Sequence, residues 1–185
     1  MRVLVACEES QEVCKAFRAK GHEAYSCDIQ ECSGGHPEWH IQGDVLPLLK
    51  EKWDLIIAHP PCTYMSKAGA RWMFPKAGEI DWDRYALAME AKEFFMTFYN
   101  CECEKVVIEN PVPLKCVELP EPTQKIQPYE FVIVISFASN LHVLSIPYVV
   151  MLESGNNLGT FATIKSSAFV KHTLLIFNNF NFDSK

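Results

Sequence analysis

The sequence predicts an α/β protein with a Rossmann-like, mostly parallel sheet. Two observations carry this prediction. Short apolar stretches alternate with segments of helical spacing, and an acidic residue or a cysteine follows nearly every apolar stretch. Strands that alternate with helices are typical of parallel βαβ units. At 185 residues the chain is long enough for one domain with a sizeable core.

The expected elements follow in order along the chain. Arg2 to Ala6 is an apolar strand, and Ser10 is expected to cap a helix over about residues 11–20 that Gly21 ends. Further strands are expected at residues 23–27, 40–42, 55–58 and 105–108, with a helical turn near 46–50 and a helix over 81–99.

Composition and charge limit the class of protein. No stretch is apolar enough to span a bilayer, and the first residues meet charge too soon for a signal peptide, so we expect a cytoplasmic protein without membrane contact. The eight cysteines are then expected to be reduced thiols. A net charge of −6 argues against a strongly basic nucleic-acid coat, although it allows a local basic groove.

The strongest local signal is the apolar run from Asp54 that ends in Pro60-Pro61-Cys62. The prolines stop the strand and hold Cys62 at its carboxyl end, where ligands bind in open α/β sheets. A thiol fixed there is a candidate nucleophile. Other polar groups also follow expected strands, and they should meet at the same edge of the sheet: Cys7, Glu8, Glu9, Asp28, Asp44 and Glu109.

The acidic residues suggest a type of cofactor. Asp28 is placed to bind ribose hydroxyls and Asp44 to contact an adenine, although each is also an ordinary turn residue. The first loop contains no glycine and two glutamates, which disfavours a pyrophosphate and therefore NAD, FAD or ATP. It is compatible with a cofactor that carries a cation, such as the sulfonium of S-adenosylmethionine.

Cys62 and Glu109 together suggest a reaction. Thiolate attack at C6 of a pyrimidine, with a proton donated at N3 by a partly buried carboxyl group, makes C5 electron-rich enough to accept a methyl group. The alternatives are a buried, inert cysteine and a carboxylate in a salt bridge.

Two motifs resemble those of DNA cytosine-5 methyltransferases. Residues 60–66 resemble the Pro-Cys-x-x-x-Ser motif, and Glu109-Asn110-Pro111 resembles the Glu-Asn motif. Residues 1–131 as a whole look like a small phage and prophage group of cytosine methyltransferase-like proteins. The resemblance implies the fold of S-adenosylmethionine-dependent methyltransferases and DNA as the substrate, with the target cytosine flipped out of the duplex.

The resemblance also implies roles for individual residues. Cys62 is the nucleophile and Glu109 assists at N3. The cofactor is expected to lie against Cys7, Glu8, Asp28, Asp44 and Pro60. The residues expected to form the catalytic loop and to contact DNA are Pro61, Ser66, Lys67, Arg71 and Asn110. Trp72 is expected near the gap that the flipped cytosine leaves in the base stack.

The composition changes abruptly after residue 131. Residues 132–185 contain three Lys or Arg and two Asp or Glu, against 14 and 21 in residues 1–131, and they contain no Cys or Trp. The Gly-His-Pro segment and the basic Lys-Arg-Thr stretch that the resemblance implies are absent. We therefore expect a catalytic core at 1–131 and a frameshifted or otherwise foreign tail that leaves the fold incomplete. A divergent β-rich extension is the alternative.

Three other functions are compatible with parts of the sequence. A remnant that binds the cofactor without catalysis is one. An adenine-N6 or cytosine-N4 amino-methyltransferase is another, but those enzymes place an aromatic side chain where this chain has Cys62. A zinc site is disfavoured because its cysteines and histidines lie at a strand end and around a flexible Gly pair, so we expect no metal; its residues would be Cys27, Cys32, His36 and His40.

Overall fold

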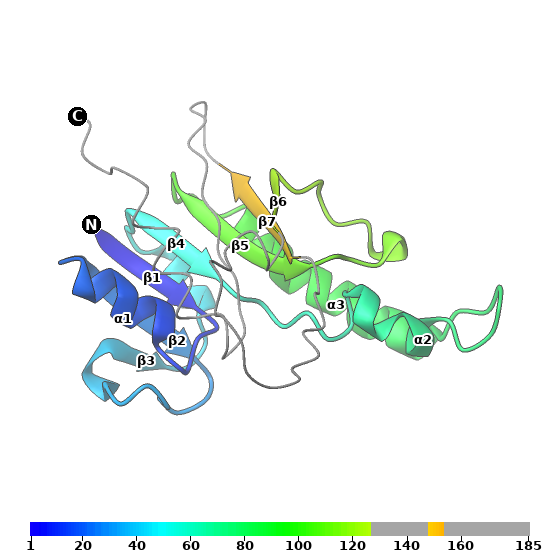
Figure 1. The fold of residues 1–185 in the computed structure, drawn as a ribbon, viewed down its shortest axis with the longest axis horizontal. Coiled ribbons are helices and arrows are strands. Elements are labelled where there is room, and N and C mark those ends of the chain that lie inside the picture. The colour runs from blue at the N-terminus through cyan, green and yellow to red at the C-terminus, as the bar shows by residue number, and fades with distance from the viewer. Residues whose placement is uncertain (127–147, 154–185) are drawn as a thin grey trace, which may run out of the picture.

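Five parallel strands form the main part of the sheet in the computed structural model, which describes residues 1–126 and 148–153 (Figure 1). Their order is β3-β2-β1-β4-β5, which is that of a doubly wound sheet, and the order reverses between β1 and β4. The predicted α/β, Rossmann-like fold is confirmed. The strands are β1 (Arg2–Ala6), β2 (Glu23–Asp28), β3 (His40–Gln42), β4 (Leu55–Ala58) and β5 (Val106–Pro111).

Two further strands extend the sheet beyond β5. β7 (Tyr148–Glu153) pairs antiparallel with both β5 and β6 (Gln124–Ile126), so β6 runs in the same direction as β5. β7 comes from the low-charge segment after residue 131, and the rest of that segment lies outside the described residues.

β5 is longer than the sequence predicted. The strand was expected to end at Ile108, but it continues to Pro111, so Glu109 and Asn110 lie inside it. The reason is the pairing with β7, which covers β5 over its full length, from Val106 to Pro111. A partner strand that follows 37 residues later could not be read from the local pattern around β5.

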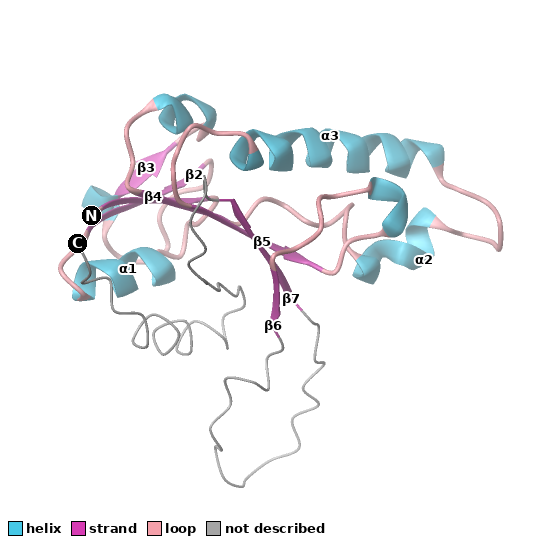
Figure 2. Cartoon of the chain, turned by 90° about the horizontal axis from the view of Figure 1, so that it is seen from above, coloured by secondary structure: helices cyan, strands magenta, loops and turns pink. Residues whose placement is uncertain are grey.

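Helices cover both faces of the sheet (Figure 2). α1 (Glu12–Ala19) lies on one face and α3 (Trp82–Tyr99) on the other, while the short α2 (Ala70–Met73) lies beyond the sheet near the start of α3. In the described parts of the chain, no helix has the length and apolarity needed to cross a membrane. Short 3₁₀ segments complete the connections: Pro37–Trp39, Leu46–Lys50, Lys67–Gly69 and Lys115–Val117.

The prediction that Ser10 caps α1 is wrong. The N-cap residue is Gln11, which has a left-handed backbone and makes no capping bond through its side chain. The buried carboxylate of Glu8 does this instead, because it accepts hydrogen bonds from the backbone amides of Val13 (2.7 Å) and Cys14 (3.2 Å). A negative charge is favourable at the positive end of a helix. Glu8 therefore anchors α1 to the end of β1.

The side chains that alternate along the central strands form the core. One face of β1, β4 and β5 packs against α3 through a continuous apolar cluster in which Phe95 and Phe98 are fully buried. The strand residues in this cluster are Leu4, Ala6, Ile56, Ala58, Val106 and Ile108.

Replacing Phe98 with alanine is expected to lower the free energy of unfolding by about 3–5 kcal/mol, since it removes a buried ring and leaves a cavity. Urea unfolding followed by circular dichroism measures the change. Phe74→Ala is the control because its ring is 39% exposed. Equal losses from the two substitutions would contradict this account of the core.

Candidate functional site

Cys62 begins a tight turn directly after β4. Pro60 is buried, Pro61 is exposed and Cys62 is half-buried. The Cys62 carbonyl oxygen accepts hydrogen bonds from the backbone amides of Met65 (3.1 Å) and Ser66 (3.0 Å). Cys62 therefore lies in the loop that leaves the sheet and not in the packed strand, as the two prolines predicted.

This loop is hydrogen-bonded to the segment that follows β5. The Lys67 amide donates to the Val112 carbonyl oxygen (2.9 Å), and the Leu114 amide donates to the Met65 carbonyl oxygen (2.7 Å). Ser66 also forms an isolated antiparallel bridge with Pro113. These bonds hold the two sequence motifs, around Cys62 and around Glu109, against each other.

Glu109 lies next to a histidine that the sequence interpretation did not include. The register pairs Ala58 of β4 with Ile108 of β5, so the following residues, His59 and Glu109, come at the same level of the sheet. His59 Nδ1 is 4.0 Å from Glu109 Oε2, and both residues are only 4% exposed. The sequence feature that could have indicated His59 is its position directly before Pro-Pro-Cys at the end of a strand.

A cavity of about 340 Å³ lies at the carboxyl ends of β1, β2 and β4. Five of the residues that the sequence singled out line it: Cys7, Glu9, Asp28, Asp44 and Pro61. The cavity is also lined by side chains that the sequence did not single out: His59, Ile29, Phe94 and Val45. The expected convergence at this edge of the sheet is therefore present for these groups.

Two other predicted cofactor residues do not line this cavity. Glu8 is buried under α1, where its carboxylate is hydrogen-bonded to helix amides, and Pro60 is buried in the strand exit. Asp28 and Asp44 each accept a hydrogen bond from the backbone amide two residues ahead, in Gln30 (2.9 Å) and Leu46 (3.0 Å). These bonds orient both carboxylates at the cavity. Each carboxylate can still accept further hydrogen bonds from a ligand.

The loop after β1 takes an unusual backbone without glycine. Cys7 and Gln11 have φ angles of 59° and 57°, in the left-handed region that non-glycine residues seldom adopt. Such conformations cluster at functional sites, where the surrounding structure holds them. Here the Gln11 side chain holds a second loop: it accepts a hydrogen bond from the His36 amide (3.0 Å) and donates one to the His36 carbonyl oxygen (2.8 Å).

Gly34, in that second loop, is expected to tolerate no side chain. A Cβ atom there would overlap the Ser10 carbonyl oxygen and the Gln11 side chain. We therefore expect Gly34→Ala to destabilise the protein by about 1–3 kcal/mol through overpacking, measured by urea unfolding. Ser33→Ala changes the neighbouring exposed side chain and is the control. If both variants match the wild type, the two loops do not pack as described.

The four residues of the disfavoured zinc site have separate partners. Cys27 Sγ donates to the Gly43 carbonyl oxygen (3.6 Å), and Cys32 Sγ donates to Gln11 Oε1 (2.9 Å). His36 contacts Glu38, and His40 Nδ1 contacts Ser26 Oγ (2.8 Å). Within residues 1–126 and 148–153, no cluster of three or more suitable side chains is arranged to hold a metal ion. Burial, with Asp28 and Asp44 nearby, raises the pKa of Cys27 to about 11, so this thiol is a poor nucleophile.

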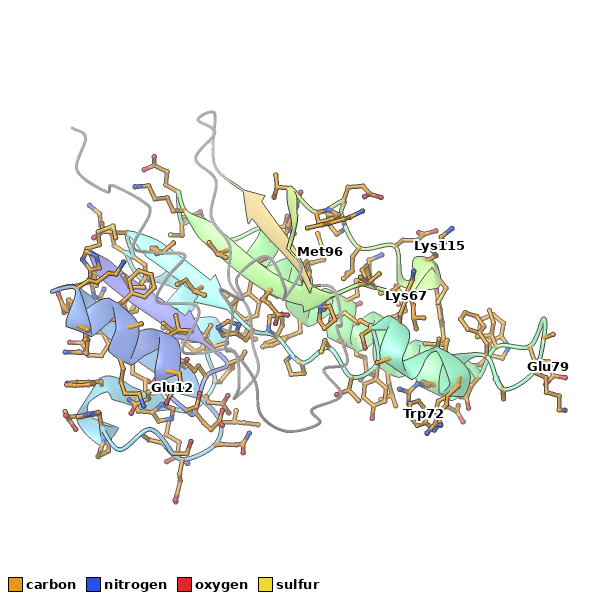
Figure 3. All side chains as sticks on the ribbon, in the orientation of Figure 1. Glu12, Lys67, Trp72, Glu79, Met96 and Lys115 are labelled. Atoms are coloured by element: carbon orange, nitrogen blue, oxygen red, sulfur yellow. The ribbon has the colours of Figure 1, made fainter. Side chains whose placement is uncertain are left out.

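The segment after Cys62 was expected to be a loop that contacts DNA, but it is helical. Residues 67–73 form a 3₁₀ turn and α2. Arg84 of α3 lies against this segment, with its guanidinium 5.6 Å from the centre of the Trp72 ring. Arg84 donates to the Thr63 carbonyl oxygen (3.1 Å) and lies 4.9 Å from the Tyr64 ring. Figure 3 shows Lys67 and Trp72 at the end of the molecule that carries α2.

The predicted DNA contacts differ in exposure. Lys67 and Arg71 are exposed, and the Arg71 guanidinium lies 3.9 Å from the ring centre of Trp72, which is half exposed. Ser66 and Asn110 are buried. Asn110 Nδ2 donates to the Pro111 carbonyl oxygen (2.6 Å), so this side chain supports the strand end from inside the protein.

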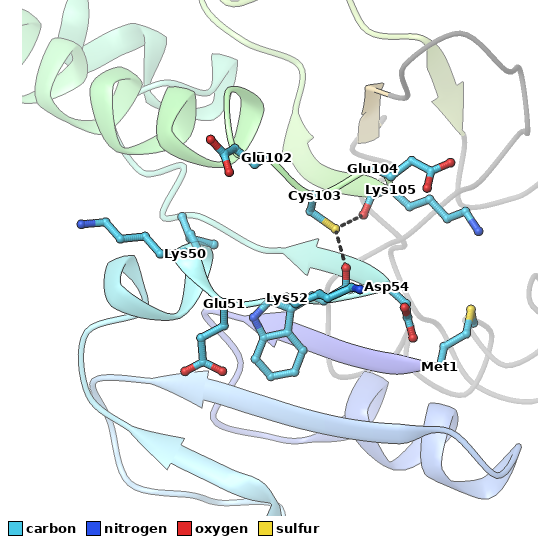
Figure 4. A pocket seen from close by; sticks show the side chains of 11 residues that line it. Met1, Lys50, Glu51, Lys52, Asp54, Glu102, Cys103, Glu104 and Lys105 are labelled. Carbon is cyan, nitrogen blue, oxygen red and sulfur yellow. Dashed lines mark hydrogen bonds between the residues drawn. The ribbon is translucent and has the colours of Figure 1, made fainter.

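A larger cavity, of about 630 Å³, lies at the opposite edge of the sheet (Figure 4). It is formed at the amino ends of the central strands, around Trp53 and Cys103, and it contains none of the predicted site residues. Cys103 Sγ donates to the Trp53 carbonyl oxygen (3.4 Å), and burial raises the pKa of this thiol. In open α/β sheets the chemistry lies at the carboxyl ends of the strands, so the smaller cavity is the better candidate site.

The solved structures that are similar to this chain include a methyltransferase. The crystal structure of the S. pombe Dnmt2 methyltransferase matches with a TM-score of 0.46 and 15% sequence identity, covering 87% of this chain and 51% of that chain. The present chain thus spans about half the length of that structure. No family model matches the sequence, and no curated protein matches it.

Proposed function

We propose that this chain is an S-adenosylmethionine-dependent methyltransferase that acts on C5 of cytosine in DNA, with Cys62 as nucleophile and Glu109 as the proton donor at N3. One observation supports this most strongly. The Cys62 loop is hydrogen-bonded to the segment after Glu109, and the adjoining cavity contains the acidic residues expected for the cofactor.

The cavity suits a nucleoside with a cationic group. Its volume of about 340 Å³ lies in the range of small-molecule sites. Asp28 and Asp44 offer carboxylate oxygens for ribose hydroxyls and adenine, while Ile29 and Phe94 offer apolar surface to a flat ring. Glu9 adds a third carboxylate, which favours a positive charge in the cavity.

Each residue then has a defined role in the reaction. The Cys62 thiolate forms a bond to C6 of the cytosine while the Glu109 carboxyl group gives its proton to N3, and the electron pair that this displaces makes C5 nucleophilic. When bound, S-adenosylmethionine supplies the methyl group. Loss of the C5 proton to a base then expels the thiolate and regenerates Cys62. Glu109 recovers its proton from N3.

DNA is the proposed partner, and the exposed Lys67 and Arg71 beside Trp72 are the proposed contacts. Cations bind phosphates, and an exposed indole stacks on a base, which suits a cytosine extruded from the duplex. We propose that activity is impaired, because residues 132–185 lack the motifs and the basic stretch that the family resemblance implies. A remnant that binds the cofactor without catalysis is the alternative.

Cofactor titration and methyl transfer test this proposal. Isothermal titration with S-adenosylmethionine, followed by transfer of tritiated methyl groups to DNA, separates the enzyme from the remnant. Binding with transfer supports the enzyme, binding without transfer supports the remnant, and no binding contradicts both.

Asp28→Asn is expected to weaken cofactor binding about tenfold, because a charge-assisted hydrogen bond to ribose is replaced by a neutral one. The same titration measures the dissociation constant. Asp83→Asn, on the exposed first turn of α3, is the control and should bind as the wild type does. An unchanged dissociation constant for Asp28→Asn would remove Asp28 from the cofactor site.

A further inference from the structure

His59 belongs to both halves of the site. His59 lines the cavity proposed for the cofactor, and its Nδ1 atom lies 4.0 Å from Glu109 Oε2. The two side chains are 1% and 6% exposed, respectively. Because water is largely excluded from the pair, each group feels the charge of the other more strongly than two surface groups would.

The other titratable groups at this cavity determine where a proton is favoured. From the ends of β1 and β2 and the loop before the 3₁₀ turn at 46–50 come the carboxylates Glu9, Asp28 and Asp44, together with the thiols of Cys7 and Cys27. α3 contributes Phe94, which carries no charge. Burial of His59 disfavours its imidazolium form, whereas Glu109 and the three carboxylates around the cavity attract a positive charge to it.

We propose that His59 and Glu109 share one proton, and that a cation in the adjoining cavity shifts this proton from His59 to Glu109. This inference rests on the proposed function, in which the cation is the sulfonium of S-adenosylmethionine. The Nδ1–H bond of the imidazolium breaks and an O–H bond forms on Glu109 Oε2, which leaves a neutral imidazole and a neutral carboxyl group. The two atoms must approach by about 1 Å to make the hydrogen bond through which the proton moves.

The transfer has a functional consequence. Glu109 needs a proton in order to donate one to cytosine N3, and a buried carboxylate beside an imidazolium lacks it. A sulfonium near His59 disfavours the imidazolium by like-charge repulsion, so the pair adopts its neutral form. Glu109 thus becomes a proton donor when the methyl donor is present. The product, S-adenosylhomocysteine, has no sulfonium charge and should leave the proton on His59.

Nuclear magnetic resonance of the imidazole nitrogens tests both parts of this inference without requiring catalysis. The His59 signal is assigned by its loss in His59→Gln, and His22, at the turn before β2, is the internal control. At a pH near the His59 titration midpoint, S-adenosylmethionine should lower the ratio of imidazolium to imidazole at least about tenfold more than S-adenosylhomocysteine does. Equal responses to the two ligands would overturn the cation-driven shift.

The shared proton is tested separately in Glu109→Gln without any ligand. Loss of the neighbouring carboxylate should lower the titration midpoint of His59 by about one pH unit or more, while that of His22 stays in place. An unchanged midpoint for His59 overturns the sharing. If neither ligand binds, the proposed function fails and the cation-driven shift fails with it, whereas the result for Glu109→Gln still decides whether the pair is coupled.

Discussion

Replacing Cys62 with alanine is expected to lower methyl transfer to DNA by at least about 1,000-fold, because loss of the nucleophile removes the step that activates C5. The rate is measured as tritiated methyl groups incorporated into cytosine-containing DNA. Cofactor affinity should not change, since Cys62 lies in the turn after Pro61 and is not among the residues that line the cavity.

Cys116→Ser is the matched control for this substitution. Cys116 is also half-buried, but it lies in the 3₁₀ segment Lys115–Val117, outside the loop that carries Cys62. It should transfer methyl groups at the wild-type rate. Substantial activity in Cys62→Ala would contradict the covalent mechanism and would favour direct transfer to an amino group.

Replacing Glu109 with glutamine is expected to slow methyl transfer by about 100- to 10,000-fold, the usual contribution of a general acid. The amide keeps the shape of the side chain inside β5 but has no carboxyl proton to give. Titration of the cofactor by calorimetry should show that the variant still binds it, since Glu109 does not line the cavity.

The control for Glu109 is Glu93→Gln, an exposed position on α3 that removes the same charge. Its rate should equal that of the wild type. A Glu109→Gln variant that transfers methyl groups as fast as the Glu93 variant would show that N3 obtains its proton from another source. Urea unfolding of both variants checks that neither change acts through stability.

The sequence was sufficient to predict the succession of strands and helices along the chain. It also predicted the edge of the sheet at which polar groups meet. Apolar runs ending in Cys7, Asp28 or Pro60-Pro61 are local signals, because a strand and its terminating residues are adjacent in the chain. The positions of Asp28 and Asp44 around one cavity then follow from parallel topology.

Other features depended on contacts that a local pattern does not contain. Glu8 caps α1 by reaching past Ser10, since the left-handed turn at Gln11 brings the helix amides to its carboxylate. The full length of β5 depends on pairing with β7, which lies far along the chain. The His59–Glu109 pair depends on the register of β4 against β5, so neither residue alone indicated it.

The segment after residue 131 carries a separate proposal. We propose that the residues from about 132 onward are a frameshifted or otherwise foreign reading of the gene, because charge, Cys and Trp all decline or disappear at one point in the chain. Translation of the source DNA in its neighbouring frames should yield a Gly-His-Pro segment followed by a basic stretch. If neither frame contains them, the tail is an extension of this protein's own.

The most direct test of the central claim is to incubate the protein with S-adenosylmethionine and DNA that contains 5-fluorocytosine. Attack by the thiolate at C6 and methyl transfer to C5 leave fluorine where a proton must depart, so the covalent bond to the protein persists. Intact-mass and peptide mass spectrometry should find the DNA attached to Cys62, in a cofactor-dependent manner. An absent adduct, or one on another cysteine, would contradict the proposed mechanism.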